Sequence, residues 1–179
     1  MPRPYFFCMK INFFLTALEV IIVCAAMPFA GCAAPQKPYS DAPVDFEYEM
    51  QGQTYALHQL RGKPLLLVMV RTSEVTNEMH LDQIQIIYNK AVRHINVLVL
   101  SIAPNEAPML DMFVEFHDYP FHIGMAPWRV TTGQSDLGIL PNIPLTYFID
   151  ENGRVTDLMI GATNAEKILK TLRRYDMIP

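Results

Sequence analysis

Hydrophobic and polar residues follow two periods along this chain, and the switches between them predict alternating strands and helices. Continuous apolar runs at Leu65–Val70 and Val97–Ile102 are typical of strands that are buried on both faces. Between these runs, from about Asn77 to Arg93, apolar residues recur at helical spacing and predict an amphipathic helix. Its predicted inward-facing residues are Leu81, Ile84, Tyr88, Ala91, Val92 and Ile95.

Two hairpins are predicted on either side of this central unit. The first joins Val44–Met50 to Thr54–Leu57 through a Gln-Gly-Gln turn. The second joins Leu145–Ile149 to Val155–Ile160 through Glu-Asn-Gly, where the Asn-Gly pair supplies the positive φ values of a tight turn.

Two further helices complete the pattern. One is predicted from Pro108 to about Asp118, because the first turn of a helix has no use for the N–H that proline lacks. The last opens at Thr163–Glu166, which has the capping-box pattern. The succession of elements describes an α/β domain, a three-layer α/β/α sandwich with a mixed central sheet and an N-terminal hairpin.

The first 31 residues have the composition of an export signal. Arg3 and Lys10 form a positive start, Ile11–Met27 is apolar, and small residues precede Cys32. A cysteine directly after Ala-Gly resembles a bacterial lipobox. That resemblance implies a lipoprotein-type signal peptide at 1–31 and a lipid joined to Cys32.

Residues 32–43 contain three prolines among small and polar residues, which predicts an extended tether before a domain at 44–179. We therefore expect the domain in the cell envelope, on the periplasmic side of a bacterial membrane and held there by lipid. Ala33 and Ala34 resemble the pattern of lipoproteins sent to the outer membrane. The alternative is an uncleaved N-terminal anchor, because about 17 apolar residues are near the short limit for spanning a bilayer.

Charge and size narrow the function classes. The chain has 179 residues and a formal net charge of −4 with charges of both signs, which gives no reason to expect a nucleic-acid partner. The region after the tether fits one domain that is large enough to bury a core without disulfides.

Two segments carry a resemblance to known families. The segment from Leu57 to Leu67, LHQLRGKPLLL, is similar to the start of the central strand in TlpA-like thioredoxins and in AhpC/TSA-type peroxiredoxins. The segment from Ile143 to Val155 resembles the stretch that carries the cis-proline opposite the active site of TlpA-like proteins. The resemblance implies a thioredoxin-like fold, and the activity usual for it is thiol–disulfide or peroxide chemistry.

The cysteines of those families are missing here. Val75 stands where peroxiredoxins keep their reactive cysteine, and a TlpA-like Cys-x-x-Cys would fall on Glu74 and Asn77. The arginine that assists peroxide reduction would align close to Pro144. Because that chemistry requires a thiolate, we predict no catalytic residue in this loop and at most one thiol, Cys32, after export.

Other chemistry at the loop has a simpler explanation. Glu74, Glu78 and His80 could form an acid/base or metal site, but acids at a helix N-terminus are expected because they complement the helix dipole. Copper-handling proteins of the Sco type share this fold, and soft or imidazole ligands are available here. These candidates are Met109, Met112, His117, His122 and Met125. We interpret them as core and loop residues, with Met112 packed against the sheet, and predict no metal and no cofactor.

A binding surface remains as the leading hypothesis. By resemblance, Ile143 before a cis Pro144 offers backbone groups to an extended peptide, and Arg71 and Trp128 lie beside it. Trp128 could anchor a partner or could cap the core of a long loop. The sequence therefore predicts a redox-inactive envelope protein that binds another protein or peptide. The rival hypothesis is an oxidoreductase or peroxiredoxin-like protein that borrows a thiol from a partner.

Overall fold

The structure is a computed structural model that describes Lys37 and residues 39–179. The predicted signal peptide, the predicted lipidation site Cys32 and the first part of the predicted tether lie outside these residues. Among the described residues, no helix is both long and apolar enough to cross a bilayer. The elements are β1 (Glu47–Met50), β2 (Gln53–Ala56), η1 (Leu57–Leu60), β3 (Leu65–Val70), α2 (Val75–Ala91), β4 (Asn96–Ser101), η2 (Pro104–Glu106), α3 (Ala107–His117), β5 (His122–Met125), α4 (Trp128–Thr131), β6 (Leu145–Ile149), β7 (Val155–Ile160) and α5 (Ala165–Arg174).

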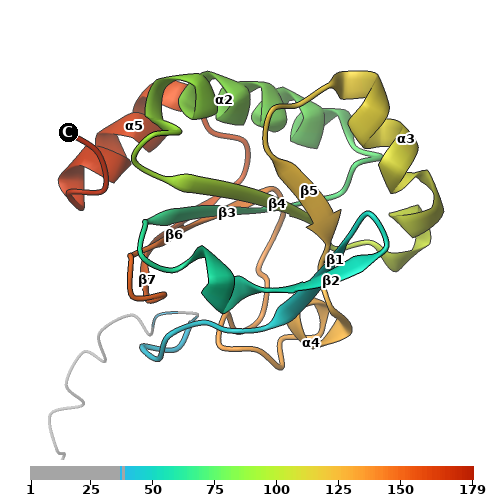
Figure 1. The fold of residues 1–179 in the computed structure, drawn as a ribbon, viewed down its shortest axis with the longest axis horizontal. Coiled ribbons are helices and arrows are strands. Elements are labelled where there is room, and N and C mark those ends of the chain that lie inside the picture. Colours follow the sequence, from blue (N-terminus) through green and yellow to red (C-terminus); the bar gives the residue numbers. More distant parts are fainter. Residues whose placement is uncertain (1–36, 38) are drawn as a thin grey trace, which may run out of the picture. The chain divides into compact units, whose positions relative to one another are not determined.

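One mixed sheet organises the domain, as the sequence predicted. Its strand order is β2-β1-β5-β4-β3-β6-β7 (Figure 1). The pairs β3–β4 and β4–β5 are parallel, and the other neighbouring strands are antiparallel. The apolar runs of β3 and β4 therefore lie in the middle of the sheet, where both faces are covered.

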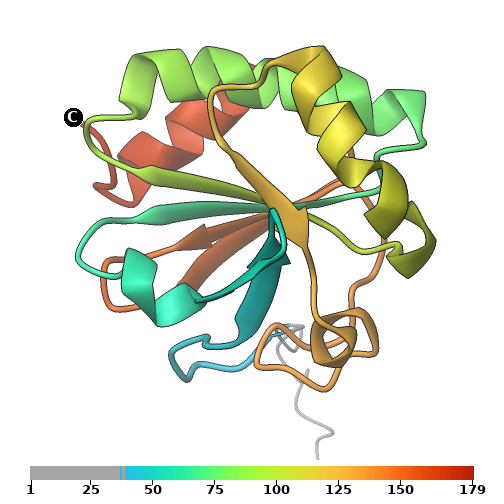
Figure 2. The same cartoon turned by 45° about the vertical axis from the view of Figure 1, so that its right-hand side comes forward.

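The two faces of β3 belong to two cores. Leu66, Val68 and Val70 face the cluster that contains residues of α2, α3 and α5. Leu65, Leu67 and Met69 face a second cluster with residues of η1, α4 and the segment that follows α4. Figure 2 shows the three longer helices on one side of the sheet and the short α4 on the other. The sandwich has three layers, but its second helical layer is thin.

Strand β5 and helix α4 were not predicted from the sequence, and neither were the short 3₁₀ helices η1 and η2. Strand β5 has four residues and contains Gly124, so its apolar signal is short. Glycine is required there because a Cβ at Gly124 would lie 2.5 Å from the carbonyl oxygen of Glu49 on β1. Helix α4 is a single turn after Pro127. Residues 39–179 therefore contain one more strand and one more α-helix than predicted, besides the two 3₁₀ helices.

The boundaries of α2 differ from the prediction by two residues at each end. Val75 is its first residue, because Glu74 has extended backbone angles and ends the preceding loop. Leu81, Ile84 and Ala91 are buried as predicted, whereas Val92 lies beyond the helix and is exposed.

Helix α3 corrects an expectation about the methionines. Met112 was expected against the sheet, but it is 68% exposed, and Met109 and Phe116 are exposed as well. Only Leu110 is fully buried, because α3 packs over β5 near the β1–β2 side of the sheet and presents one narrow stripe to the core.

The turn after β6 and the N-cap of α5 are both present, and each differs in detail from the sequence prediction. In the turn after β6 only Gly153 has a positive φ, and the Asp150 carboxylate accepts hydrogen bonds from the N–H groups of Asn152 and Arg154. Helix α5 is capped by Asn164, whose Oδ1 accepts from the N–H of Lys167 at 3.0 Å. The cap is therefore one residue later than a capping box on Thr163 would place it.

The described end of the predicted tether contacts the domain. The N–H of Ser40 donates to the carbonyl oxygen of Asp136 at 2.9 Å. Tyr39 is partly buried and packs against the second core cluster. These contacts hold the chain against the domain before β1 begins.

Candidate functional site

The predicted active-site loop and the predicted cis-proline meet at one end of the sheet. β3 ends at Val70 and α2 begins at Val75, so the loop lies at the carboxyl end of a central strand. β6 runs antiparallel to β3 with Leu145 opposite Met69, which brings Pro144 to the same end. The Ile143–Pro144 peptide bond is cis, as the resemblance implied.

Val75 occupies the first position of α2 and its side chain is 70% exposed. A helix N-terminus favours a negative charge such as a thiolate, but valine cannot ionise. Met79, one turn further along, is exposed as well. The position that aligns with the reactive cysteine of peroxiredoxins is therefore occupied by an exposed apolar side chain, and Met79 extends this apolar surface along α2.

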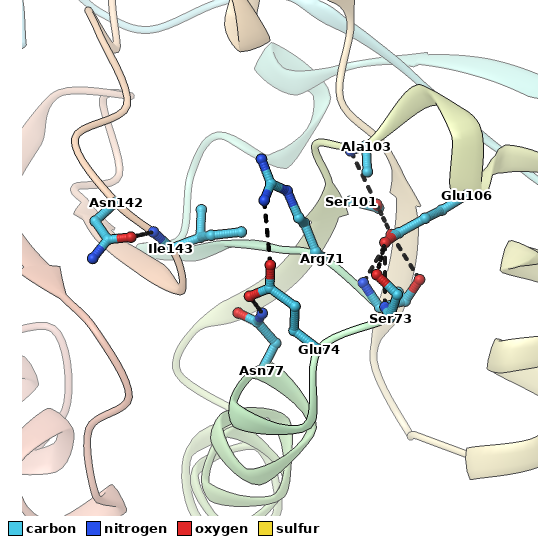
Figure 3. A network of polar contacts seen from close by, with 10 residues as sticks. Arg71, Ser73, Glu74, Asn77, Ser101, Ala103, Glu106, Asn142 and Ile143 are labelled. Carbon is cyan, nitrogen blue, oxygen red and sulfur yellow. Dashed lines mark hydrogen bonds and ion pairs between the residues drawn. The ribbon is translucent and has the colours of Figure 1, made fainter.

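The other register of the missing cysteines falls on two residues that bind each other. The Glu74 carboxylate accepts a hydrogen bond from Nδ2 of Asn77 at 2.9 Å and pairs with Nη1 of Arg71 at 3.2 Å (Figure 3). Asn77 is buried, and its Oδ1 has no hydrogen-bond donor among the described residues. The carboxylate of Glu74 therefore makes its contacts within the loop and the first turn of α2.

A buried carboxylate that the sequence analysis missed holds the loop from behind. Glu106, 6% exposed, accepts five hydrogen bonds. Its Oε2 takes the N–H and hydroxyl of Thr72 and the hydroxyl of Ser101, and its Oε1 takes the N–H and hydroxyl of Ser73 (Figure 3). In the sequence, Glu106 is marked only as an acidic residue shortly after a buried strand. Many exposed acidic residues have the same kind of position, so the pattern does not identify a buried carboxylate.

The environment of Glu106 keeps it ionised. Burial alone raises the pKa of a carboxyl group, but the hydrogen bonds from Ser73, Ser101 and Thr72 outweigh burial and lower the pKa of Glu106 from 4.5 to about 2. All five donors point at a negative charge, so the conformation of Thr72–Ser73 depends on that charge.

A hydrogen bond from His80 connects α2 to β6, the strand that follows Pro144. The Nδ1 of His80 accepts the N–H of Thr163 at 3.2 Å, so Nε2 carries the hydrogen and donates to Oγ1 of Thr146 at 2.8 Å. Burial in the core lowers the pKa of His80 below its usual value. His80 is fully buried and bonded elsewhere, so it does not form a site with Glu74 and Glu78.

The residue before the cis-proline has one backbone group already in use. The N–H of Ile143 donates to Oδ1 of Asn142 at 2.9 Å (Figure 3). Its carbonyl oxygen accepts no hydrogen bond from the described residues. Strand addition at Ile143 would therefore begin with a peptide N–H donating to that carbonyl oxygen.

Trp128 lines a pocket to which neither Ile143 nor Arg71 contributes. It lines this pocket, which has a volume of about 450 Å³, together with residues of β1 and of the start of α3. Its side chain is 62% exposed, which does not fit a role in capping the core. The structure therefore places Trp128 in the wall of a pocket that is not lined by Arg71, Ile143 or Pro144.

The copper candidates lie on α3, which carries Met109, Met112 and His117, and at the two ends of β5, which are His122 and Met125. His117 stacks on the ring of Tyr119 at 5.2 Å, Met109 and Met112 are on the exposed side of α3, and Met125 lines the Trp128 pocket. Within the described part of the chain, no three His, Cys, Asp or Glu residues are grouped as metal ligands.

Solved structures share this fold at low sequence identity. The exposed lipoprotein thioredoxin Etrx1 of Streptococcus pneumoniae has a TM-score of 0.60 and 21% identity, covering 73% of this chain and 98% of its own. Peroxidoxin BcpB of Mycobacterium tuberculosis has a TM-score of 0.61 and 19% identity over 78% and 98%. A thio-disulfide isomerase of Thermus thermophilus has a TM-score of 0.58 and 19% identity over 78% and 96%.

No protein-family model matches the chain, and no curated protein sequence matches it. The structural likeness shows that the chain has a thioredoxin-like fold. At these identities it does not carry an activity from the solved proteins to this one.

Proposed function

We propose that this protein is a membrane-anchored, extracytoplasmic thioredoxin-like protein that binds another protein or peptide without redox chemistry. The observation that carries the proposal is the exposed Val75 at the first position of α2. A nucleophile there would have the helix N-terminus and the solvent access that thiol chemistry needs, and valine can use neither.

The surface around Val75 suits binding. Val75 and Met79 are both exposed and lie one helical turn apart, so they share one side of α2. Ile143 is half-buried nearby, and its carbonyl oxygen faces no donor from the described residues. We call Val75, Met79, Ile143 and Pro144 the cis-proline surface. An extended segment could pair with the Ile143 carbonyl oxygen and lay an apolar side chain on Val75.

Anchoring is part of the same proposal. The sequence pattern before Cys32 supports a lipidated cysteine, and the pneumococcal neighbour is itself described as an exposed lipoprotein. We place the domain on the periplasmic side of a bacterial membrane, with the outer membrane preferred. Lipidation is tested by metabolic labelling with a radioactive fatty acid: Cys32→Ser should abolish incorporation, whereas Cys24→Ser should not.

The second candidate function is a thiol oxidoreductase or peroxidase. The names of the thio-disulfide isomerase and the peroxidoxin among the structural neighbours favour it. Residues 37–179 contain no cysteine, so the thiol would have to come from Cys32 or from a partner.

Insulin reduction and peroxide consumption by the full chain separate the two candidates. We expect no turnover above buffer, with Val75→Cys as a probe of whether the position can support a reactive thiol. Turnover by the unmodified chain that disappears in Cys32→Ser would reject the non-catalytic proposal.

The binding role is tested with a photo-crosslinking residue at Val75 and, as the matched control, at the exposed Ile160 of β7. The same products from both positions would reject a specific cis-proline surface.

A further inference from the structure

The Trp128 pocket has chemistry that the proposed function does not use. It lies between β1, the start of α3 and the residues that follow β5, and its volume is about 450 Å³. Glu47 and Glu49 line it from β1, Met125 and Trp128 line it from β5 and α4, and Ala107 lines it from α3. None of its lining residues belongs to the cis-proline surface.

Two carboxylates, those of Glu47 and Glu49, line the pocket from one face of β1. Successive side chains of a strand point to opposite faces, so Glu47 and Glu49 share one face of β1 while Tyr48 between them is buried in the core. The pocket lining contains no Lys, Arg or His. The ion pairs found among the described residues involve neither glutamate. The pocket therefore carries two carboxylates that form no ion pair among the described residues, and Arg129 lines only the neighbouring hollow.

The aromatic wall of the pocket favours the same kind of ligand. Trp128 is the only tryptophan of the chain, and it is mostly exposed although it is a large apolar side chain. An indole ring is the best aromatic partner for a cation, and two nearby carboxylates add to the attraction. Met125, Ala126 and Pro127 supply apolar contact for a methylene stem.

The surface continues past Trp128, which favours an extended ligand. A second hollow of about 330 Å³ shares Glu47, Pro127 and Trp128 with the pocket. It reaches Asp45 and His58, which pair at 3.0 Å, and Arg129. A single small amine would fill only one of the two hollows, whereas a polypeptide segment can cross both.

We propose that the Trp128 pocket binds the side chain of a lysine or arginine in an extended segment of a partner protein. The cationic group lies between Glu47, Glu49 and the face of the Trp128 ring, and the stem lies along Met125 and Pro127. The neighbouring residues of the segment occupy the second hollow. This role does not depend on the binding proposed for the cis-proline surface.

Trp128 fluorescence of the full chain reports directly on this pocket because no other tryptophan is present. The probe is acetyl-Gly-Ala-Lys-Ala-Gly-amide, and its matched control carries norleucine, which keeps the stem and lacks the charge. We expect the lysine peptide to bind about tenfold more tightly than the norleucine peptide, with an affinity that weakens as salt is added. Equal responses to the two peptides, or no response to either, would overturn the proposal.

Variants and a small amine complete the test. Glu47→Gln with Glu49→Gln should weaken lysine-peptide binding about tenfold, and the matched pair Glu151→Gln with Glu166→Gln, at exposed positions outside the pocket, should not change it. Unchanged binding in the first pair would reject the role of the carboxylates. Butylamine should bind more weakly than the peptide, and equal affinity would show a site for a free amine rather than for a polypeptide.

Discussion

Glutamates occupy two contrasting regions of this molecule. Glu106 is buried behind the loop and accepts five hydrogen bonds from it, whereas Glu47 and Glu49 are exposed in a pocket without a cation. A carboxylate whose lone pairs are used within the chain stabilises the fold. A carboxylate left to solvent beside an exposed aromatic ring is available for a ligand. The same side chain therefore has a structural role in one region and a proposed binding role in the other.

The largest effect on stability is expected from removing the carboxylate of Glu106. Glu106→Ala leaves buried N–H and hydroxyl donors of Thr72, Ser73 and Ser101 without their acceptor. We expect a loss of about 3 kcal/mol or more in the free energy of unfolding, measured by urea denaturation. Glu106→Gln should lose less, because one acceptor oxygen remains. A loss below about 1 kcal/mol in the alanine variant would contradict the structural role.

Acid should weaken the same region in a defined pH window. The pKa of Glu106 is lowered from 4.5 to about 2, so the unfolded chain binds the proton more readily than the folded chain. Its stabilising contribution is present above pH 4.5 and is lost as the pH falls through about 2, with a total on the order of 3 kcal/mol. Urea unfolding across this range should show a shallower acid dependence for Glu106→Gln. Identical slopes would show that other carboxyl groups dominate.

His80 extends the test to the cis-proline side of the loop. Because burial lowers the pKa of His80 below 6.5, the unfolded chain takes up the proton first as the pH falls. Its contribution to stability is therefore present above pH 6.5 and is lost below it, at no more than about 1.4 kcal/mol per pH unit. His80→Gln should remove this part of the pH dependence of unfolding. The exposed His94→Gln is the control, and a matching change there would contradict the assignment.

The smallest effect is expected in the Trp128 pocket. Glu47→Gln with Glu49→Gln should change the free energy of unfolding by no more than about 0.5 kcal/mol, because exposed side chains without partners contribute little to stability. Any change should be a gain, since two like charges on one strand face repel each other. A loss above about 1 kcal/mol in urea denaturation would mean that these glutamates have a structural role, and the contrast with Glu106 would disappear.

The sequence was sufficient to predict the central part of the fold and the lack of a cysteine in the loop between β3 and α2. Apolar runs identified β3 and β4, and helical spacing identified α2. The cis bond before Pro144 was implied by the resemblance of that segment to TlpA-like proteins. The signals for the two strands and the helix are local, because each apolar run or helical spacing lies within the element itself. The absence of cysteine near Val75 also needs no structure.

Tertiary structure decided the features that depend on distant residues. β5 is too short to show a period, and it becomes a strand because β4 and β1 offer it backbone partners. Met112 has a core-like side chain, but the position of α3 over β5 leaves it exposed. Residue type alone could not predict either outcome.

The two glutamate regions follow the same rule. The sequence by itself determined that the loop has no sulfur and that the chain carries a single tryptophan. Only the folded chain brings Glu106 within hydrogen-bonding distance of Thr72, 34 residues away, and places Glu47 and Glu49 beside Trp128. A carboxylate has the same chemistry at every position, and whether it meets donors, solvent or an aromatic ring depends on packing between elements that are far apart in the sequence.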